Sequence, residues 1–376
     1  MIYLDHAATT PVPKAVADTM YEALTNFANP SAQYPMGQEQ KLTVEAHRTT
    51  VAKALACAPQ CVHFTSCGTE SDNWAIMGAL HHGRHVGRHI ITTAVEHSAI
   101  LETCKALQQQ GYEVTYLKPD KTGHVTAQQV ADALREDTVL VSVMLVNNET
   151  GCIFPLADIA RVMKEKGSRA LLHTDAVQGF LKVPSAPAEL GVDLMSLSGH
   201  KIGAPKGIGV LYIAPHLKNF RPLLFGGGQE MGLRSGTEAT AQIAGFAKAV
   251  ELRWENLEES RQHMAAIKDY CREKLLSIDG IVAVGAGEAP HILSVSMVGY
   301  PSANVVTDLG AQGICLSAGS ACHRGKLSHV VQALGLDKRT AGGVLRLSFG
   351  PETTFEEIDA VCAALANHKA SRFPML

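Results

Sequence analysis

Polar residues follow several of the apolar, β-branched segments of the chain, where strands are predicted to end. In chain order they are Gly68, Thr69 and Glu70; Glu96 and His97; Asn147, Asn148 and Glu149; Asp175 and Gln178; and Gly199, His200 and Lys201. Ligands usually bind at the carboxyl ends of parallel strands, which meet at one edge of a sheet. We therefore expect these side chains to surround one site, although each residue taken singly also has a structural explanation, such as a turn cap.

A lysine, a carboxylate, a histidine and a phosphate cradle are together the groups that pyridoxal phosphate requires. Lys201 offers an amine for a Schiff base with the cofactor's aldehyde. Asp175 offers a carboxylate that keeps the pyridine nitrogen protonated. The helix predicted to begin at Gly68 and Thr69 offers free backbone N–H groups and a hydroxyl to the phosphate. The sequence thus predicts a pyridoxal phosphate site.

Cys322 is a second reactive candidate, in the segment "SAGSACHRG" at 317–325. No apolar pattern surrounds it, so it is not expected in a core. Small residues before it favour a mobile loop. His323 and Arg324 follow it, and positive charge is what lowers the pKa of a thiol and makes the nucleophilic thiolate.

The elements that position these residues alternate between short apolar strands and amphipathic helices. This alternation predicts an α/β layer with a largely parallel sheet. The apolar run 139–146 is typical of a strand buried on both faces. A long helical stretch at 239–278 looks like a connection to a smaller α+β unit. We expect a large domain at 15–255, with 1–14 and 256–376 forming a small domain that carries Cys322.

Composition limits the classes of function. The 376 residues are 46% hydrophobic with a formal net charge of −3, so no basic surface for nucleic acid is expected. No apolar run is long enough to cross a membrane, and the first residues do not resemble a secretory signal. Nine cysteines are therefore expected as reduced thiols in the cytoplasm. Cys57 and Cys61 lack a second pair at zinc-site spacing, so no metal is predicted.

Ten motifs together resemble those of the NifS/IscS-type cysteine desulfurases, which are class V aminotransferases with the fold type I architecture of pyridoxal phosphate enzymes. The resemblance runs from near the first residue to the last predicted helix. The motifs are "YLDHAATTPV" at 3–12, "NPSA" at 29–32, "FTSCGTESDNWAI" at 64–76, "TAVEHSAIL" at 93–101, "VNNETG" at 146–151, "HTDAVQ" at 173–178, "SLSGHKIGAPKGIGVLY" at 196–212, "GGGQEMGLRSGT" at 226–237, "SAGSAC" at 317–322 and "LRLSFG" at 345–350. The resemblance implies a large domain with a mostly parallel seven-stranded sheet between helices.

The resemblance also assigns roles around the cofactor ring. Lys201 of "SGHK" is the Schiff-base lysine and moves the substrate's Cα proton. Asp175 pairs with the pyridine nitrogen, and Gln178 contacts the ring hydroxyl. His97 stacks on the ring and takes part in proton transfer.

By the same resemblance, the cofactor's phosphate is held from two subunits. Thr69, beside Gly68, acts together with Ser198 and His200. Thr237 of "RSGT" reaches the phosphate of the partner subunit, so a homodimer is implied.

The implied reaction converts L-cysteine to L-alanine and passes the sulfur on. Asn148, which also contacts the cofactor, and Arg346 hold the substrate carboxylate, which the guanidinium fork binds with two hydrogen bonds. Cys322 is the nucleophile that becomes a persulfide. The final acceptor is implied to be another protein, either an iron–sulfur scaffold or a tRNA thiolation enzyme. The segment after Cys322 is shorter and more basic than in the common version, which leaves the acceptor open.

Three alternative functions match parts of the sequence. A selenocysteine lyase, or a related C–S lyase on the same fold, remains compatible. A non-enzymatic sulfur-transfer scaffold is disfavoured, because Lys201, Asp175, His97 and Cys322 are all present. The strings "SDN" at 71–73, "KTG" at 121–123 and Ser-x-x-Lys at 198–201 also occur in serine β-lactamases, but there in a different order.

Overall fold

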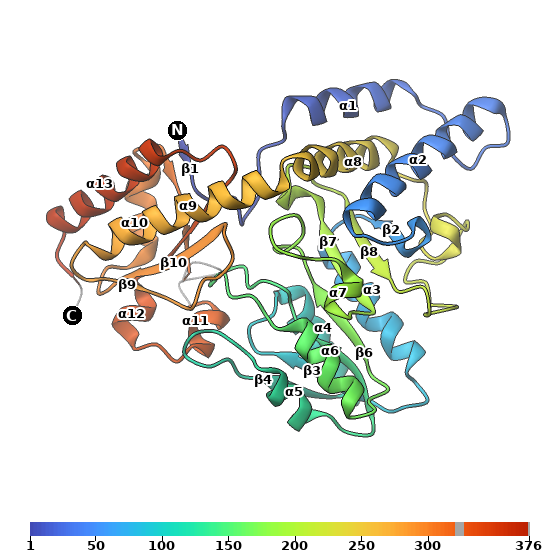
Figure 1. Cartoon of the computed structure of the whole chain (residues 1–376), viewed down its shortest axis with the longest axis horizontal. Helices are drawn as coiled ribbons and strands as arrows, with labels where there is room; N and C mark the ends of the chain where they lie inside the picture. Colours follow the sequence, from blue (N-terminus) through green and yellow to red (C-terminus); the bar gives the residue numbers. More distant parts are fainter. Residues whose placement is uncertain (320–326, 375–376) are drawn as a thin grey trace.

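The computed structural model describes residues 1–319 and 327–374, arranged as two units side by side (Figure 1). Cys322, with its neighbours His323 and Arg324, lies outside the described residues. Within the described residues, no helix is long and apolar enough to cross a membrane.

The larger unit is built on a seven-stranded sheet. In spatial order the strands are β2 (Val62–Thr65), β8 (Gly209–Ile213), β7 (Leu194–Ser198), β6 (Leu171–Asp175), β5 (Thr138–Ser142), β3 (His89–Thr93) and β4 (Glu113–Leu117). β8 runs antiparallel to both of its neighbours, and the remaining pairs are parallel. The prediction of a mostly parallel seven-stranded sheet is confirmed.

Helices cover this sheet, which explains why its central strands are buried along their whole length. α3 packs on strands β5 to β8, and α1 and α2 pack on α8. The helices of this unit are α1 (Lys14–Thr25), α2 (Pro35–Ala54), α3 (Gly68–His82), α4 (Ser98–Gln108), α5 (Ala127–Ala133), α6 (Leu156–Glu165), α7 (Pro187–Leu190) and α8 (Thr240–Glu255), with 3-10 turns η1 (Pro59–Cys61), η2 (Gly199–Lys201) and η3 (Glu230–Gly232).

The smaller unit has its own sheet and its own apolar core. Its antiparallel strands lie in the order β12 (Ser317–Ala318), β13 (Val344–Ser348), β10 (Ile292–Met297) and β9 (Ile281–Ala283). Its helices are α9 (Leu257–Leu276), α10 (Ser302–Gly310), α11 (His329–Ala333), α12 (Lys338–Gly342) and α13 (Phe355–Ser371). The chain's first strand β1 (Ile2–Tyr3) joins this unit by pairing with β11 (Ile314–Cys315), and Leu4 belongs to its core. The exact domain boundaries stay a prediction.

Two expected elements differ in the structure. The helical stretch 239–278 is two helices, because the backbone at Asn256 leaves the helical conformation between α8 and α9. The run 139–146 is regular strand only to Ser142. After Ser142, β3 no longer runs beside this segment. Met144 N therefore donates its hydrogen bond to the carboxyl group of Glu96, at 2.9 Å, and not to a neighbouring strand.

Candidate active site

A cavity of about 410 Å³ opens at the carboxyl ends of the central strands, against the small unit. Ten of the predicted site residues line it: Gly68, Thr69, His97, Asn148, Asp175, Gln178, Ser198, His200, Lys201 and Arg346. Thr237 does not line it and is exposed. The expectation of one shared site at the sheet edge agrees with the structure for His97, Asn148, Asp175, Gln178 and Lys201. It does not hold for five other residues that were expected there, since none of them lines the cavity: Glu70, Glu96, Asn147, Glu149 and Gly199. The individual roles of the lining residues stay predictions.

The sheet explains how distant residues meet. Asp175 is the last residue of β6 and Ser198 the last of β7. Gly68 begins α3, and His97 caps the start of α4. Lys201 lies in the 3-10 turn η2 that directly follows β7.

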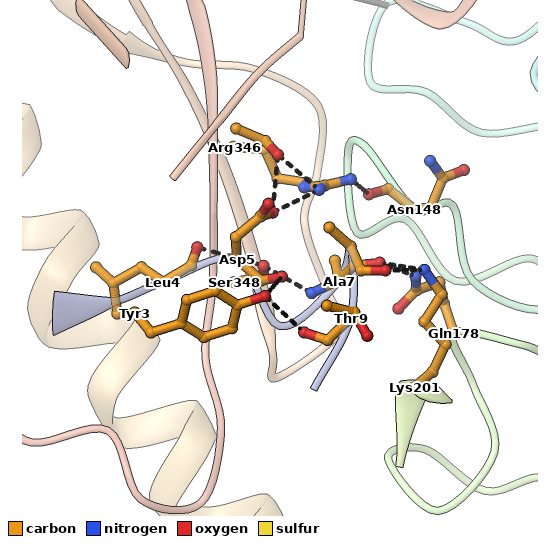
Figure 2. Close-up of polar contacts among 12 residues, drawn as sticks. Tyr3, Leu4, Asp5, Ala7, Thr9, Asn148, Gln178, Lys201, Arg346 and Ser348 are labelled. Carbon is orange, nitrogen blue, oxygen red and sulfur yellow. Dashed lines mark hydrogen bonds and ion pairs between the residues drawn. The ribbon is translucent and has the colours of Figure 1, made fainter. Parts of the chain in front are cut away.

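Lys201 points at the N-terminal segment of the chain (Figure 2). Its Nζ donates hydrogen bonds to the carbonyl oxygens of Ala7 and Ala8, both at 2.7 Å. Burial lowers its pKa to about 8, with a further lowering by Arg346 that the charge of Asp175 opposes. A lysine of this kind has a reactive neutral fraction near neutral pH.

Asp175 and His97 are fixed by backbone amides. Oδ1 of Asp175 accepts a hydrogen bond from Val177 N at 2.9 Å, and burial raises the pKa of this carboxyl. Nδ1 of His97 accepts from Ala99 N at 3.2 Å, so the ring proton lies on Nε2. The carboxyl of Asp175, the ring of His97 and the carboxyl of Asp72 each offer an atom within 4.8 Å of the others.

The end of the cavity near α3 suits a phosphate. A Cβ on Gly68 would lie 3.0 Å from a methyl of Val177 and 3.3 Å from Cβ of Ser198, so glycine keeps the helix N-terminus open. Burial, with the charge of Lys201, lowers the pKa of His200 to about 4, which leaves a neutral imidazole. Its Nδ1 lies 3.1 Å from the hydroxyl oxygen of Thr9.

Arg346 lies at the opposite end of the cavity and reaches it from the small unit. Its two terminal nitrogens donate to Asn148 O at 2.8 Å, to Asp5 Oδ1 at 2.8 Å and to Ser317 Oγ at 3.0 Å (Figure 2). Its Nε is buried without a hydrogen-bond partner among the described residues. A cation with a spare donor at the cavity wall is suited to an anionic group of a ligand.

Comparison with known proteins places this site in a family. The model of the aminotransferase class-V family matches residues 2–361. The chain belongs to this family. The sequence-based prediction of a class-V aminotransferase is therefore confirmed, together with its fold.

Several named proteins and solved structures are similar to this chain. A cysteine desulfurase IscS of Methanosarcina thermophila is 42% identical over 96% of this chain and 90% of its own length. A putative cysteine desulfurase IscS 1 of Bacillus subtilis is 38% identical over 97% and 98%. Among solved structures, a NifS-like protein has a TM-score of 0.92 at 37% identity, covering 98% of this chain and 99% of that one. The structure of SspA in complex with cysteine has a TM-score of 0.81 at 34% identity, covering 94% and 100%.

Sequence reasoning missed Asp72, which this class-V site places in the cavity wall. Asp72 is only 1% exposed, and its Oδ1 has no hydrogen-bond partner among the described residues. Burial and the neighbouring Asp175 raise the pKa of Asp72 well above its usual range, which disfavours the charged form. The signal was its spacing: Asp72 follows Gly68 by four residues on α3, which puts both on one helix face.

Sequence reasoning also missed the N-terminal segment. Asp5, Ala7 and Ala8 supply the polar atoms that hold Arg346 and Lys201. A backbone carbonyl has no sequence signature, so only the fold reveals these contacts.

Proposed function

We propose that the chain is a pyridoxal phosphate-dependent cysteine desulfurase, which converts L-cysteine to L-alanine and transfers the sulfur to Cys322. The observation that carries this proposal is the shared cavity. One space of about 410 Å³ is bounded by the amine of Lys201, the carboxyl of Asp175 and the guanidinium of Arg346. The names of the similar proteins support the choice of cysteine as substrate.

The residues of the cavity fit the cofactor from end to end. The open helix start at Gly68, with Thr69, Ser198 and His200, would hold the phosphate. Asp175 would pair with the ring nitrogen, Gln178 with the ring hydroxyl, and His97 with the ring face. When bound, pyridoxal phosphate supplies an aldehyde that condenses with an amine and a pyridinium that withdraws electrons from the substrate.

Lys201 performs two tasks in this proposal. Its low pKa gives the free amine that binds the cofactor near neutral pH. With the substrate bound, Lys201 Nζ would remove the Cα proton of cysteine and later return protons to the carbon skeleton. The carbonyl oxygens of Ala7 and Ala8 keep Nζ at the cavity wall.

Arg346 and Asn148 orient the substrate. The unpaired Nε of Arg346 is available to a carboxylate, whereas its terminal nitrogens already contact Asp5 and Asn148. The negative charge of Asp5 opposes a second anion beside it. The substrate carboxylate therefore has to displace Asp5 from part of its ion pair with Arg346.

Cys322 completes the reaction as a thiolate. Its sulfur attacks the sulfur of the substrate, so an S–S bond forms and the C–S bond breaks. The electron pair stays on the β-carbon, which is protonated and becomes the methyl group of alanine. Cys322 carries the persulfide until an acceptor thiol removes the outer sulfur.

The assembly and the location follow from the same proposal. The protein acts as a homodimer in which Thr237 completes the neighbour's phosphate site. Exposed apolar side chains in the same segment, Phe225 and Met231, and others on α1, Tyr21 and Leu24, support a covered surface there. The acceptor is an iron–sulfur scaffold or a tRNA thiolation enzyme, and the location is the cytoplasm, where thiols stay reduced.

A paired substitution tests the proposal. We expect Lys201→Ala to lose the visible Schiff-base band near ~420 nm and all alanine release from L-cysteine. The control is Lys206→Ala, which removes an exposed lysine five residues away and is expected to keep both. Wild-type protein that releases alanine from selenocysteine but none from cysteine would favour a selenocysteine lyase instead.

A further inference from the structure

A second cluster of reactive side chains lies away from the cavity, where the two units meet. His124 and Cys152 come from the large unit, and Glu288 comes from the loop before β10. The nitrogen, sulfur and oxygen atoms that they offer all lie within 4.8 Å of one another. The proposed reaction uses none of these three side chains.

The hydrogen bonds around His124 fix which nitrogen faces the cluster. The single hydroxyl proton of Thr122 is donated to Asp120 Oδ1 at 2.6 Å. The same hydroxyl oxygen lies 2.8 Å from His124 Nδ1. Because its only proton is already donated to Asp120, this oxygen accepts a hydrogen bond from Nδ1, which therefore carries a proton. This leaves Nε2 directed at the cluster.

Nε2 lies 2.6 Å from Glu288 Oε1, so a proton or a cation is shared between the two groups. Two lone pairs would repel each other at this distance, and either a proton on one of the groups or a bound cation removes that repulsion. A simple ion pair needs only His124 and Glu288. The fully buried sulfur of Cys152 lies beside this pair as a third donor, and a cation would use all three atoms.

We propose that His124, Cys152 and Glu288 form a zinc site. Nitrogen, thiolate and carboxylate are the ligands that Zn²⁺ takes in proteins, and a fourth position is left for water. Ligand atoms around tetrahedral zinc are roughly 3.3–3.7 Å apart, as the usual bond lengths require. Glu288 is the most exposed of the three and is free to adjust to this spacing.

The surroundings also resemble those of a built metal site. A metal-bound histidine commonly donates its other nitrogen to a group that orients the ring, and here Thr122 and Asp120 form such a relay. When zinc binds, the proton of Cys152 leaves, and with it the hydrogen bond from its sulfur to Thr122 O. That carbonyl oxygen stays paired, because Ala286 N also donates to it at 2.8 Å.

The position of the site gives it a structural consequence. Cys152 lies on the loop that also carries Asn148, whose carbonyl oxygen holds Arg346. Glu288 already accepts a hydrogen bond from Ile153 N on that loop at 3.2 Å. Zinc would therefore fasten the small unit to the loop that borders the active-site cavity.

Zinc binding by the cofactor-loaded enzyme tests the proposal. After treatment with a chelator, the protein is titrated with Zn²⁺ in competition with a chromophoric chelator. We expect one zinc per chain, and we expect both His124→Gln and Glu288→Gln to abolish its binding. Thr122→Val should weaken binding about 10- to 100-fold, since it breaks the relay without touching a ligand.

Two control variants separate this site from incidental binding. His216→Gln removes a comparable histidine–carboxylate pair, at 3.1 Å from Asp193, and Cys322→Ser removes the proposed nucleophile. Both are expected to keep the zinc. Zinc should also raise the melting temperature of the wild type but not of Glu288→Gln, whose exposed position allows folding. Equal zinc affinity in wild type and His124→Gln, or loss of the zinc only in Cys322→Ser, would overturn the proposal.

Discussion

Two buried polar clusters of the molecule differ in how completely their hydrogen bonds are made. In the first, Arg48 donates to Val62 O at 2.8 Å and to both oxygens of Glu230, at 2.6 and 3.0 Å. Phe64 N adds a third hydrogen bond to Glu230 at 2.8 Å. Both charged side chains are only 3% exposed, and none of the residues of this cluster lines the active-site cavity.

The second cluster surrounds the active-site cavity and leaves polar atoms without partners. Asp72 Oδ1 and Arg346 Nε are buried and unpaired among the described residues. Buried polar groups are normally paired, so an unpaired group that borders a cavity calls for a ligand. In these two clusters, complete pairing accompanies a stabilising role, and unpaired atoms accompany the cavity in which a ligand is proposed to bind.

The largest expected effect is on stability, from Glu230→Gln. Removing Glu230, the buried partner of this ion pair, leaves Arg48 paired only with the half-exposed Glu45, and breaking a buried pair typically costs about 3–5 kcal/mol of unfolding free energy. Chemical denaturation measures this loss, and activity per folded molecule should be unchanged. Glu45→Gln is the control, because Glu45 is the exposed partner of Arg48 and should matter by less than about 1 kcal/mol. Similar losses in both variants would remove the distinction between the clusters.

The opposite behaviour is expected of Asp175→Asn in the cavity. The neutral amide no longer holds the cofactor's ring nitrogen protonated, so kcat should fall about 100- to 1,000-fold, as when other preorganised electrostatic groups are lost. The unfolding free energy should not fall, because the buried carboxyl carries an unfavourable raised pKa. Steady-state alanine release and denaturation are measured on the same preparation. A destabilised but fully active variant would contradict the assignment.

Arg346→Lys tests the substrate end of the cavity with a smaller effect. Lysine keeps the positive charge but loses the guanidinium fork and its Nε donor. We expect KM for L-cysteine to rise roughly 10-fold or more, as the loss of a charge-assisted hydrogen bond implies, with a smaller change in kcat. An unchanged KM would move the carboxylate site elsewhere.

The smallest effect is expected from Asp72→Asn, and its sign depends on pH. The folded-state pKa of Asp72 is raised, so the wild type loses stability as pH rises above the unfolded-state value near 3.8. Asp72→Asn has no carboxyl group at this position, so its stability does not fall with rising pH for this reason. Its melting temperature should therefore exceed that of the wild type at pH 7, and the difference should vanish below about pH 4. A variant that is less stable at every pH would show that Asp72 is a structural residue.

The sequence predicts the parts of this account that depend on local pattern. Alternating strands and helices predict the parallel sheet, and the sheet brings Asp175 and Lys201 to one edge. Contacts between distant segments were not predictable. Asp5 and Arg346 are joined across the two ends of the chain, and the carbonyls that hold Lys201 belong to residues of no chemical distinction. Only packing of the first strand into the small unit creates these contacts.

The proposed zinc ligands were missed for a related reason. His124, Cys152 and Glu288 come from three separate loops, so they show no metal-binding spacing in the sequence. The expectation that no metal binds relied on such spacing alone.

Mass spectrometry after reaction with L-cysteine tests the central claim most directly. The enzyme is incubated with L-cysteine without reductant, its thiols are blocked, and each cysteine peptide is examined while free alanine is measured. The account predicts one added sulfur atom on Cys322 and one alanine released for each persulfide formed, with neither in Lys201→Ala. Sulfur added to another cysteine with normal alanine release, or a persulfide that forms without alanine, would contradict it.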